Sequence, residues 1–130
     1  MATVERFEDL RIWQTARQLV KEIYSATKQR AFRRDFALRD QITRAATSAM
    51  SNIAEGFERG SRKEFVQFLN IAKGSNGEVR SQLYVALDQE YLDNQAFESL
   101  RHAALSLSRQ IASFIRYLEK YPSNRRRRKP

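Results

Sequence analysis

The chain contains little glycine and proline, one histidine and no cysteine. In 130 residues there are four Gly, two Pro, one His and no Cys. Without cysteine there can be no disulfide, no thiol nucleophile and no thiolate metal ligand. Both prolines lie near the C-terminal end, at Pro122 and Pro130. Nothing between residues 1 and 121 therefore forbids a helix.

Long apolar runs are also missing from the chain. No stretch approaches the roughly 18 apolar residues of a membrane span, and no apolar segment follows Met1 to Arg6, so we expect no signal peptide. The 42% of hydrophobic residues, with eight Phe and five Tyr, suffice for the core of one domain. We expect a soluble, cytoplasmic protein without membrane contact.

The residue types needed for catalysis are scarce. A single imidazole, His102, cannot build a zinc site, a di-iron bundle or a serine triad. Residues 72–75, with the order Ala-Lys-Gly-Ser, superficially resemble a phosphate-binding loop, but that loop needs Gly-Lys-Ser/Thr after a strand. We therefore expect no enzyme, no cofactor and no metal, with His102 solvated.

Apolar residues recur at helical spacing in four long blocks. They predict helices over about residues 9–29, 36–55, 61–90 and 94–121. Asp9 and Asp35 are the expected N-caps of the first two helices, and Gly56 the expected stop of the second. Ser61 and Glu64 form a capping box before the third. We predict an all-α fold, an antiparallel up-and-down four-helix bundle over residues 1–121, with a disordered basic tail over 122–130.

Gly74 and Gly77 interrupt the third block. We interpret them as close-contact or bend positions within one helix, and the alternative is a loop at residues 74–77 that would give five shorter helices. The polar residues Asn52, Glu55 and Glu78 lie near the apolar stripes, where pairing between helices would fix their register. The candidate partners of these three residues are Arg44, Lys73 and Arg80.

Several apolar residues fall outside the main stripes of the first two helices. These residues widen the core or form a subunit interface, and the sequence leaves both open. They are Leu10, Ala26, Phe36, Met50 and Phe57.

Positive charge is concentrated in two short segments. The net charge is +9, and five of these charges come from Arg125, Arg126, Arg127, Arg128 and Lys129. A second cluster, Lys28, Arg30, Arg33 and Arg34, surrounds the first connection between helices. Basic clusters of this kind are typical of phosphate contacts. No recognition motif and no aromatic stacking platform accompany them, so sequence-specific readout is not expected.

Separated strings in the chain resemble a known bacterial family. The resemblance covers residues 7–120 and rests on FEDL at 7–10, IWQ at 12–14, LRDQITRA at 38–45, SNIAEG at 51–56, EF at 64–65 and FLNIAKGS at 68–75. Glu78 with Gln82 and Leu83 match the same pattern. The family is that of the four-helix-bundle proteins from intervening sequences of 23S ribosomal RNA genes. The resemblance implies a ring-shaped homopentamer. It extends to the accessory variability determinant of diversity-generating retroelements, which binds nucleic acid and a reverse transcriptase.

Two functions follow as hypotheses. The first is an oligomeric nucleic-acid-binding or accessory protein, for RNA more than DNA, with the two basic clusters as phosphate contacts. The second is a protein-interaction scaffold that recruits a partner such as a polymerase or a reverse transcriptase. A basic tail that only aids solubility is the third possibility.

Overall fold

The computed structural model describes residues 4–120, and these residues form helices and connections without any strand. The elements are a 3-10 helix η1 (Phe7–Asp9) and the α-helices α1 (Arg11–Thr27), α2 (Arg30–Arg34), α3 (Phe36–Glu58), α4 (Arg62–Asp88) and α5 (Asn94–Lys120). The prediction of an all-helical chain is confirmed. The expected basic tail lies outside the described residues.

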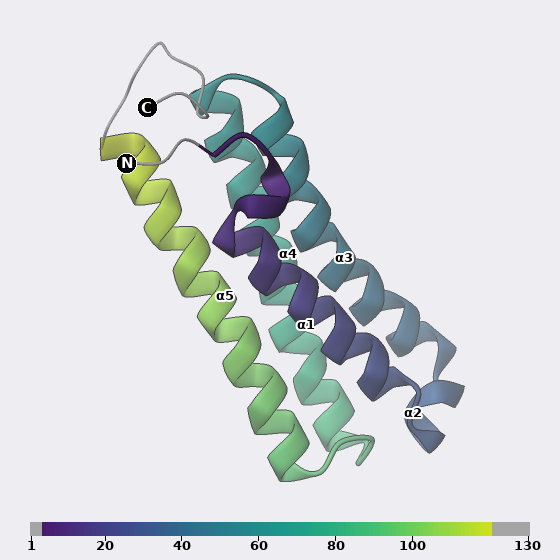
Figure 1. The fold of residues 1–130 in the computed structure, drawn as a ribbon. Helices are drawn as coiled ribbons and strands as arrows, with labels where there is room; N and C mark the ends of the chain where they lie inside the picture. Colours follow the sequence, from purple (N-terminus) through teal and green to yellow (C-terminus); the bar gives the residue numbers. More distant parts are fainter. Residues whose placement is uncertain (1–3, 121–130) are drawn as a thin grey trace.

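The four long helices lie side by side, and successive long helices run in opposite directions (Figure 1). Helix α1 packs against α3 and α5, and α4 packs against α3 and α5. The short helix α2 and the α4–α5 connection lie at one end of the molecule. The start of α1, the α3–α4 connection and the end of α5 lie at the other end.

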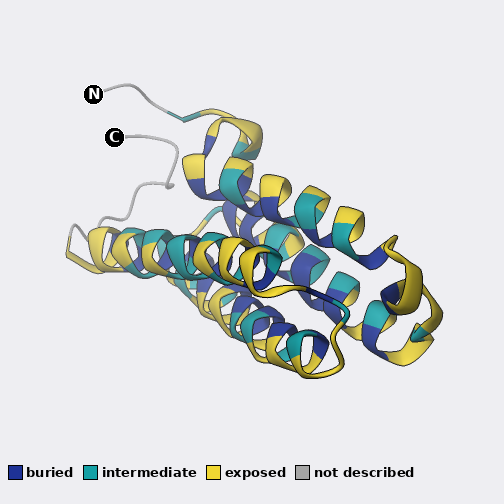
Figure 2. Cartoon of the chain, turned by 90° about the horizontal axis from the view of Figure 1, so that it is seen from below, coloured by how far each residue is buried: buried dark blue, intermediate teal, exposed yellow. Residues whose placement is uncertain are grey.

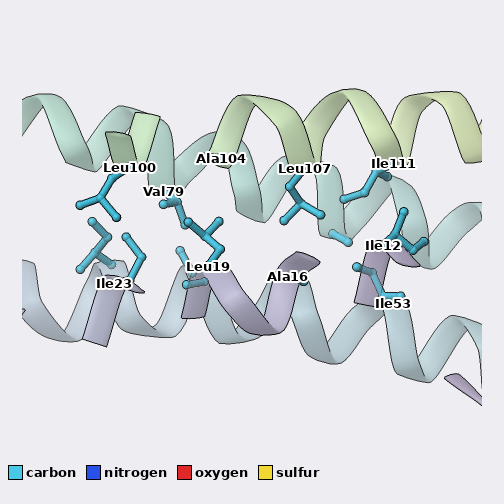
Figure 3. Packing of buried hydrophobic residues seen from close by; sticks show 14 of the residues in the cluster. Ile12, Ala16, Leu19, Ile23, Ile53, Val79, Leu100, Ala104, Leu107 and Ile111 are labelled. Carbon is cyan, nitrogen blue, oxygen red and sulfur yellow. The ribbon is translucent and has the colours of Figure 1, made fainter. Parts of the chain in front are cut away.

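The core runs along the centre of these helices, with buried residues facing inward and exposed residues outward (Figure 2). Figure 3 shows Ile12, Ala16, Leu19 and Ile23 of α1 opposite Leu100, Ala104, Leu107 and Ile111 of α5, with Val79 of α4 near Leu100 and Ile53 of α3 next to Ile12. Fully burying one such Leu or Ile side chain contributes about 1.5–3 kcal/mol. In α5, Ile115 is buried, whereas its neighbour Phe114 is only partly buried. Leu10 and Phe57 belong to the core, so these two residues widen the apolar face that their segments turn toward it.

Two helix starts have the side-chain caps that the sequence predicts, and a third start is capped by Asp93. The Asp35 carboxylate accepts a hydrogen bond from Leu38 N at 3.1 Å. The Ser61 hydroxyl accepts one from Glu64 N at 3.1 Å and donates to the Glu64 carboxylate at 2.9 Å. Asp93 accepts from Ala96 N at 2.7 Å. Each such cap stabilises its helix by about 1 kcal/mol.

The expected cap at Asp9 is wrong. Asp9 ends η1, and α1 begins two residues later at Arg11, with Leu10 at the N-cap and no side-chain cap. The cause is tertiary, because Leu10 is buried in the core and Phe7 packs edge-on against Trp13, with ring centroids 5.2 Å apart. This packing turns the chain before α1 can start.

Gly56 does not end the second long helix. Helix α3 continues to Glu58, and the positive φ of 94° occurs at Gly60, the position that favours glycine after a helix. Gly56 is instead a contact point between α3 and α4. A Cβ at this position would lie 2.7 Å from Phe68 Cβ and 2.9 Å from a ring carbon of Phe65.

Helix α4 passes through Gly74 and Gly77 without a break, as predicted. The close-contact interpretation of these glycines is wrong within this chain, because a Cβ at either position would meet nothing within 4 Å. Both glycines face open space on a 27-residue helix.

Polar pairing between helices is present, but it uses other residues than predicted. The Ser48 and Ser75 hydroxyls are 2.9 Å apart and join α3 to α4. Asn52 donates to the Ser48 carbonyl at 2.8 Å, and so supports this contact from within α3. The predicted partners are wrong for Glu55, which pairs with Arg59 of its own helix at 3.7 Å. Glu78 is exposed.

A second polar contact is fully buried. Asn76 has no exposed surface, and its Nδ2 donates to the Ala104 carbonyl of α5 at 2.6 Å. Its Oδ1 has no hydrogen-bond partner among the described residues. Because a buried amide must face its acceptor, this bond sets the axial register of α4 against α5.

Candidate nucleic-acid interface

The first predicted basic cluster surrounds a short helix that the sequence did not reveal. Lys28 follows the end of α1, and Arg30, Arg33 and Arg34 belong to α2. All four side chains are exposed. The structure therefore brings these predicted site residues together at one end of the molecule (Figure 1).

Helix α2 is anchored by the residue between its cations. Phe32 is only 1% exposed, and its ring stacks on Tyr91 from the α4–α5 connection with 5.2 Å between centroids. The Tyr91 hydroxyl donates to the second oxygen of Asp35 at 2.9 Å. One carboxylate thus caps α3 and holds Tyr91 against α2. A five-residue helix would be marginal alone, so these contacts give its cations a defined position.

The Tyr91 contact also changes the acidity of its phenol. The hydrogen bond to Asp35, and then burial and the negative charge of Asp35, raise the pKa of Tyr91 above its usual 10.0. The phenol therefore stays protonated and able to donate this bond.

The positive charge outside the tail is confined to one segment. Residues 11–44 contain nine basic and three acidic side chains, a net of +6, whereas residues 45–120 contain nine of each. Residues 11–44 span α1, α2 and the first half of α3. This asymmetry is readable in the sequence by counting charges per segment, and the prediction from the cluster alone missed it.

On α1 the cations form one stripe. Arg17, Lys21, Tyr24 and Lys28 follow spacings of four, three and four, which places them on one exposed helix face. The opposite flank of α1, with Arg11, Thr15, Gln18 and Glu22, lines a groove against α5. The stripe therefore lies on the flank that α1 turns toward α3.

Helix α3 adds an exposed aromatic residue to these cations. Phe36 is 64% exposed, and the Arg39 guanidinium lies 4.8 Å from its ring centroid. Arg39 also donates to the Arg33 carbonyl of α2 at 3.2 Å. Phe36, which the spacing places beside the apolar stripe, is thus an exposed aromatic residue next to these cations.

We call this set of residues the α1–α3 basic surface. It consists of Arg17, Lys21, Lys28, Arg30, Arg33, Arg34 and Arg39.

The second predicted cluster, Arg125 to Lys129, lies outside the described residues. The last described residue, Lys120, lies at the end of the molecule opposite α2 (Figure 1). Helix α5 has 27 residues and is about 40 Å long at 1.5 Å per residue. The structure therefore does not bring the end of α5 close to the α2 cations.

Comparison with known proteins decides the family. Residues 8–113 match the family described as 23S rRNA-intervening sequence protein. The chain belongs to this family. The resemblance seen in the separated sequence strings is thus confirmed.

One solved relative of this family member shares its fold. It is a crystal structure of a protein of unknown function from the S23 ribosomal protein family of Bacteroides thetaiotaomicron, with a TM-score of 0.73 and 24% identity. The match covers 80% of this chain and 97% of that protein. No curated protein matches the chain.

His102 and the acidic residues of the described chain form no metal site. No group of three or more His, Asp or Glu residues within residues 4–120 could hold a metal ion. His102 is exposed on the groove between α1 and α5. None of the described helices is long and apolar enough to cross a membrane.

Proposed function

We propose that this chain is a non-enzymatic nucleic-acid-binding protein of the cytoplasm that binds RNA in preference to DNA through the α1–α3 basic surface. The observation that carries the proposal is the concentration of exposed cations on α1, α2 and the start of α3, beside a body that is otherwise neutral. The name of the family refers to an intervening sequence of 23S rRNA.

The local geometry supports contact with a phosphate backbone. Arg30, Arg33 and Arg34 are held on one anchored helix, so they need little ordering before they meet several phosphates. The single negative charge of Asp35, whose oxygens accept hydrogen bonds from Leu38 N and Tyr91, is outnumbered by the basic residues around it. Backbone contacts of this kind give affinity without sequence readout.

We also propose that the protein acts as an antiparallel four-helix bundle assembled into a homopentamer. Apolar side chains on the outer face of α4, namely Ile71, Tyr84 and Val85, are about half exposed. Gly74 and Gly77 leave open space beside them, which would let another helix approach closely. Five copies would carry a net charge of about +45, and multivalent contacts would strengthen weak binding.

The oligomer can be tested by light scattering on the full chain. The substitution Gly74→Leu adds a bulky side chain where this chain itself has free space, so each protomer should still fold. We expect the measured mass to fall toward that of a single chain. A pentameric wild type with an unchanged Gly74→Leu pentamer would exclude this face as the interface.

The binding site can be tested by a salt series of fluorescence anisotropy titrations with a labelled RNA strand. The triple variant Arg30→Gln/Arg33→Gln/Arg34→Gln removes three cations of the α1–α3 basic surface. The control variant Lys63→Gln/Lys73→Gln/Arg109→Gln removes three exposed cations elsewhere, so both variants lose the same net charge.

Each phosphate contact on a single strand contributes about 0.7 to the slope of log affinity against log salt. We expect the first variant to reduce that slope by about 2 for each protomer engaged, and the control to leave it nearly unchanged. Equal losses in both variants would mean that overall charge, and not this surface, drives binding. A version that ends at Ser123 measures the contribution of Arg125 to Lys129 separately.

A protein scaffold is the second candidate function, in which the half-exposed Ile71 and Val85 of α4 would contact a partner protein in place of another copy of the chain. Pull-down from a nuclease-treated lysate distinguishes it from RNA binding. A polymerase or reverse transcriptase that stays bound after nuclease treatment, and is lost in Gly74→Leu, would support the scaffold.

A further inference from the structure

We propose that Phe36 is a stacking site for an unpaired base of single-stranded RNA. The inference rests on the proposed function and extends it, because it assigns a preference for single strands over duplexes. Cations alone cannot give this preference, since both forms present phosphates.

The first argument is the exposure of Phe36. Its side chain is 64% exposed, more than the other large hydrophobic residues exposed in the described chain, although α3 has a well-formed core face. Single exposed apolar residues are common. Phe36 differs from an incidental one because it lies within a group of fixed cations.

The second argument is the position of Arg39. Its guanidinium lies over the Phe36 ring at 4.8 Å, and it is held there by the Arg33 carbonyl at 3.2 Å and the Asp40 carboxylate at 3.7 Å. A planar guanidinium beside an aromatic ring offers two surfaces on which a flat base can stack. Helices α2 and α3 thus hold this pair in place together.

The third argument is charge complementarity around the ring. Arg33 and Arg34 precede Phe36 by three and two residues, and both are exposed. Of the two nearby acids, Asp35 uses both carboxylate oxygens as acceptors toward Leu38 N and Tyr91, and Asp40 pairs with Arg39 at 3.7 Å. A base on Phe36 would therefore have its phosphates next to cations, as in single-strand sites that combine stacking with a basic surface.

A duplex cannot use this site, because its bases are already stacked inside the helix. Stacking of one base on an aromatic residue is worth about a 5- to 150-fold gain in affinity. We therefore expect Phe36→Ala to weaken binding of an unstructured RNA strand about 10-fold, with an unchanged salt slope. Binding of the corresponding duplex should stay the same.

The test uses the full chain and four proteins. They are the wild type, Phe36→Ala, Phe36→Trp and the control Tyr117→Ala, which removes a partly exposed aromatic residue from α5. Phe36→Trp should restore strand affinity, and its emission should be quenched by the strand but not by the duplex. Trp13 is buried, so the wild type gives the background signal. Circular dichroism checks that each variant is helical.

The outcomes separate this inference from the proposed function. A wild type that binds neither RNA form would overturn both. Salt-dependent binding that Phe36→Ala leaves unchanged, or weakens equally for strand and duplex, would overturn only the stacking site. A loss in Tyr117→Ala equal to that in Phe36→Ala would also overturn it, because the effect would not be local.

Discussion

The contact between Gly56 and the α4 aromatic residues gives the sharpest test of the fold. Replacing this glycine by alanine normally stabilises a helix by about 1 kcal/mol. Here the added Cβ would lie 2.7 Å from Phe68 Cβ and 2.9 Å from a Phe65 ring carbon. Phe68 Cβ is attached directly to the α4 backbone, so it cannot rotate away. Helices α3 and α4 must therefore separate.

The size of the effect follows from that separation. Ordinary contact begins at 3.4–4 Å, so the helices must move apart by about 1 Å. Overpacking of this kind costs about 1–3 kcal/mol, and loss of the Ser48–Ser75 hydrogen bond adds about 1 kcal/mol. After subtraction of the helix-propensity gain, we expect Gly56→Ala to lower the free energy of unfolding by about 1–3 kcal/mol.

Gly74→Ala is the matched control. It makes the same chemical change in the middle of a helix, but its Cβ meets nothing within 4 Å. We expect it to raise the free energy of unfolding by about 0.5–1 kcal/mol. The two alanine variants should therefore differ by about 2–4 kcal/mol, although the sequence change is identical.

Urea unfolding followed by circular dichroism measures both variants. The titration is repeated at two protein concentrations, because a midpoint that moves with concentration would report assembly and not the fold of one chain. A Gly56→Ala variant at least as stable as the wild type would refute the close approach of α3 and α4 at this position.

Three further predictions concern polar groups. Asn76→Asp should lower the free energy of unfolding by at least about 3 kcal/mol at neutral pH, because it places a carboxylate against the Ala104 carbonyl. Since burial raises the pKa of that carboxyl, urea titrations should show this loss shrinking toward acid pH. A loss that does not depend on pH would contradict the prediction. Because the pKa of Tyr91 is raised, its hydrogen bond to Asp35 stabilises the fold fully below pH 10.0, and this stabilisation is lost as pH rises through the folded-state pKa. In Tyr91→Phe, the free energy of unfolding should fall less steeply over this alkaline range. Asp35→Ala removes the acceptor for Leu38 N and the acceptor for the Tyr91 hydroxyl together, and should lower the free energy of unfolding by about 1–2 kcal/mol. Asp35→Ser should recover the part of this loss that comes from the helix cap. Equal losses of the two variants in thermal unfolding would show that the cap contributes nothing.

Much of the fold is readable from local patterns. Apolar spacing predicts the four long helices, and Asp35 and Ser61 mark two of their starts correctly. A cap is a contact between neighbours in the sequence, so its signal is local. The predicted cap at Asp9 was wrong because the turn before α1 is set by burial of Leu10 among residues from elsewhere in the chain.

The candidate site was only partly predictable. The cluster of Lys28, Arg30, Arg33 and Arg34 is visible as a run of charges. Its anchoring is not, because Phe32 and Tyr91 are 59 residues apart and meet only through the packing of two connections. Likewise, Phe36 looked like one more apolar residue of an α3 face, and its exposure depends on the rotation of α3 within the molecule.

The sequence by itself determined the helical class, the approximate helix boundaries, the family and the position of the charges along the chain. These properties depend on residue type and on spacing over one or two turns. Tertiary structure alone decided that Gly56 is a contact between helices, that Gly74 faces open space, and that Phe36 lies exposed beside Arg39. Each depends on which helix lies opposite and at what distance, and a one-dimensional pattern does not contain that information.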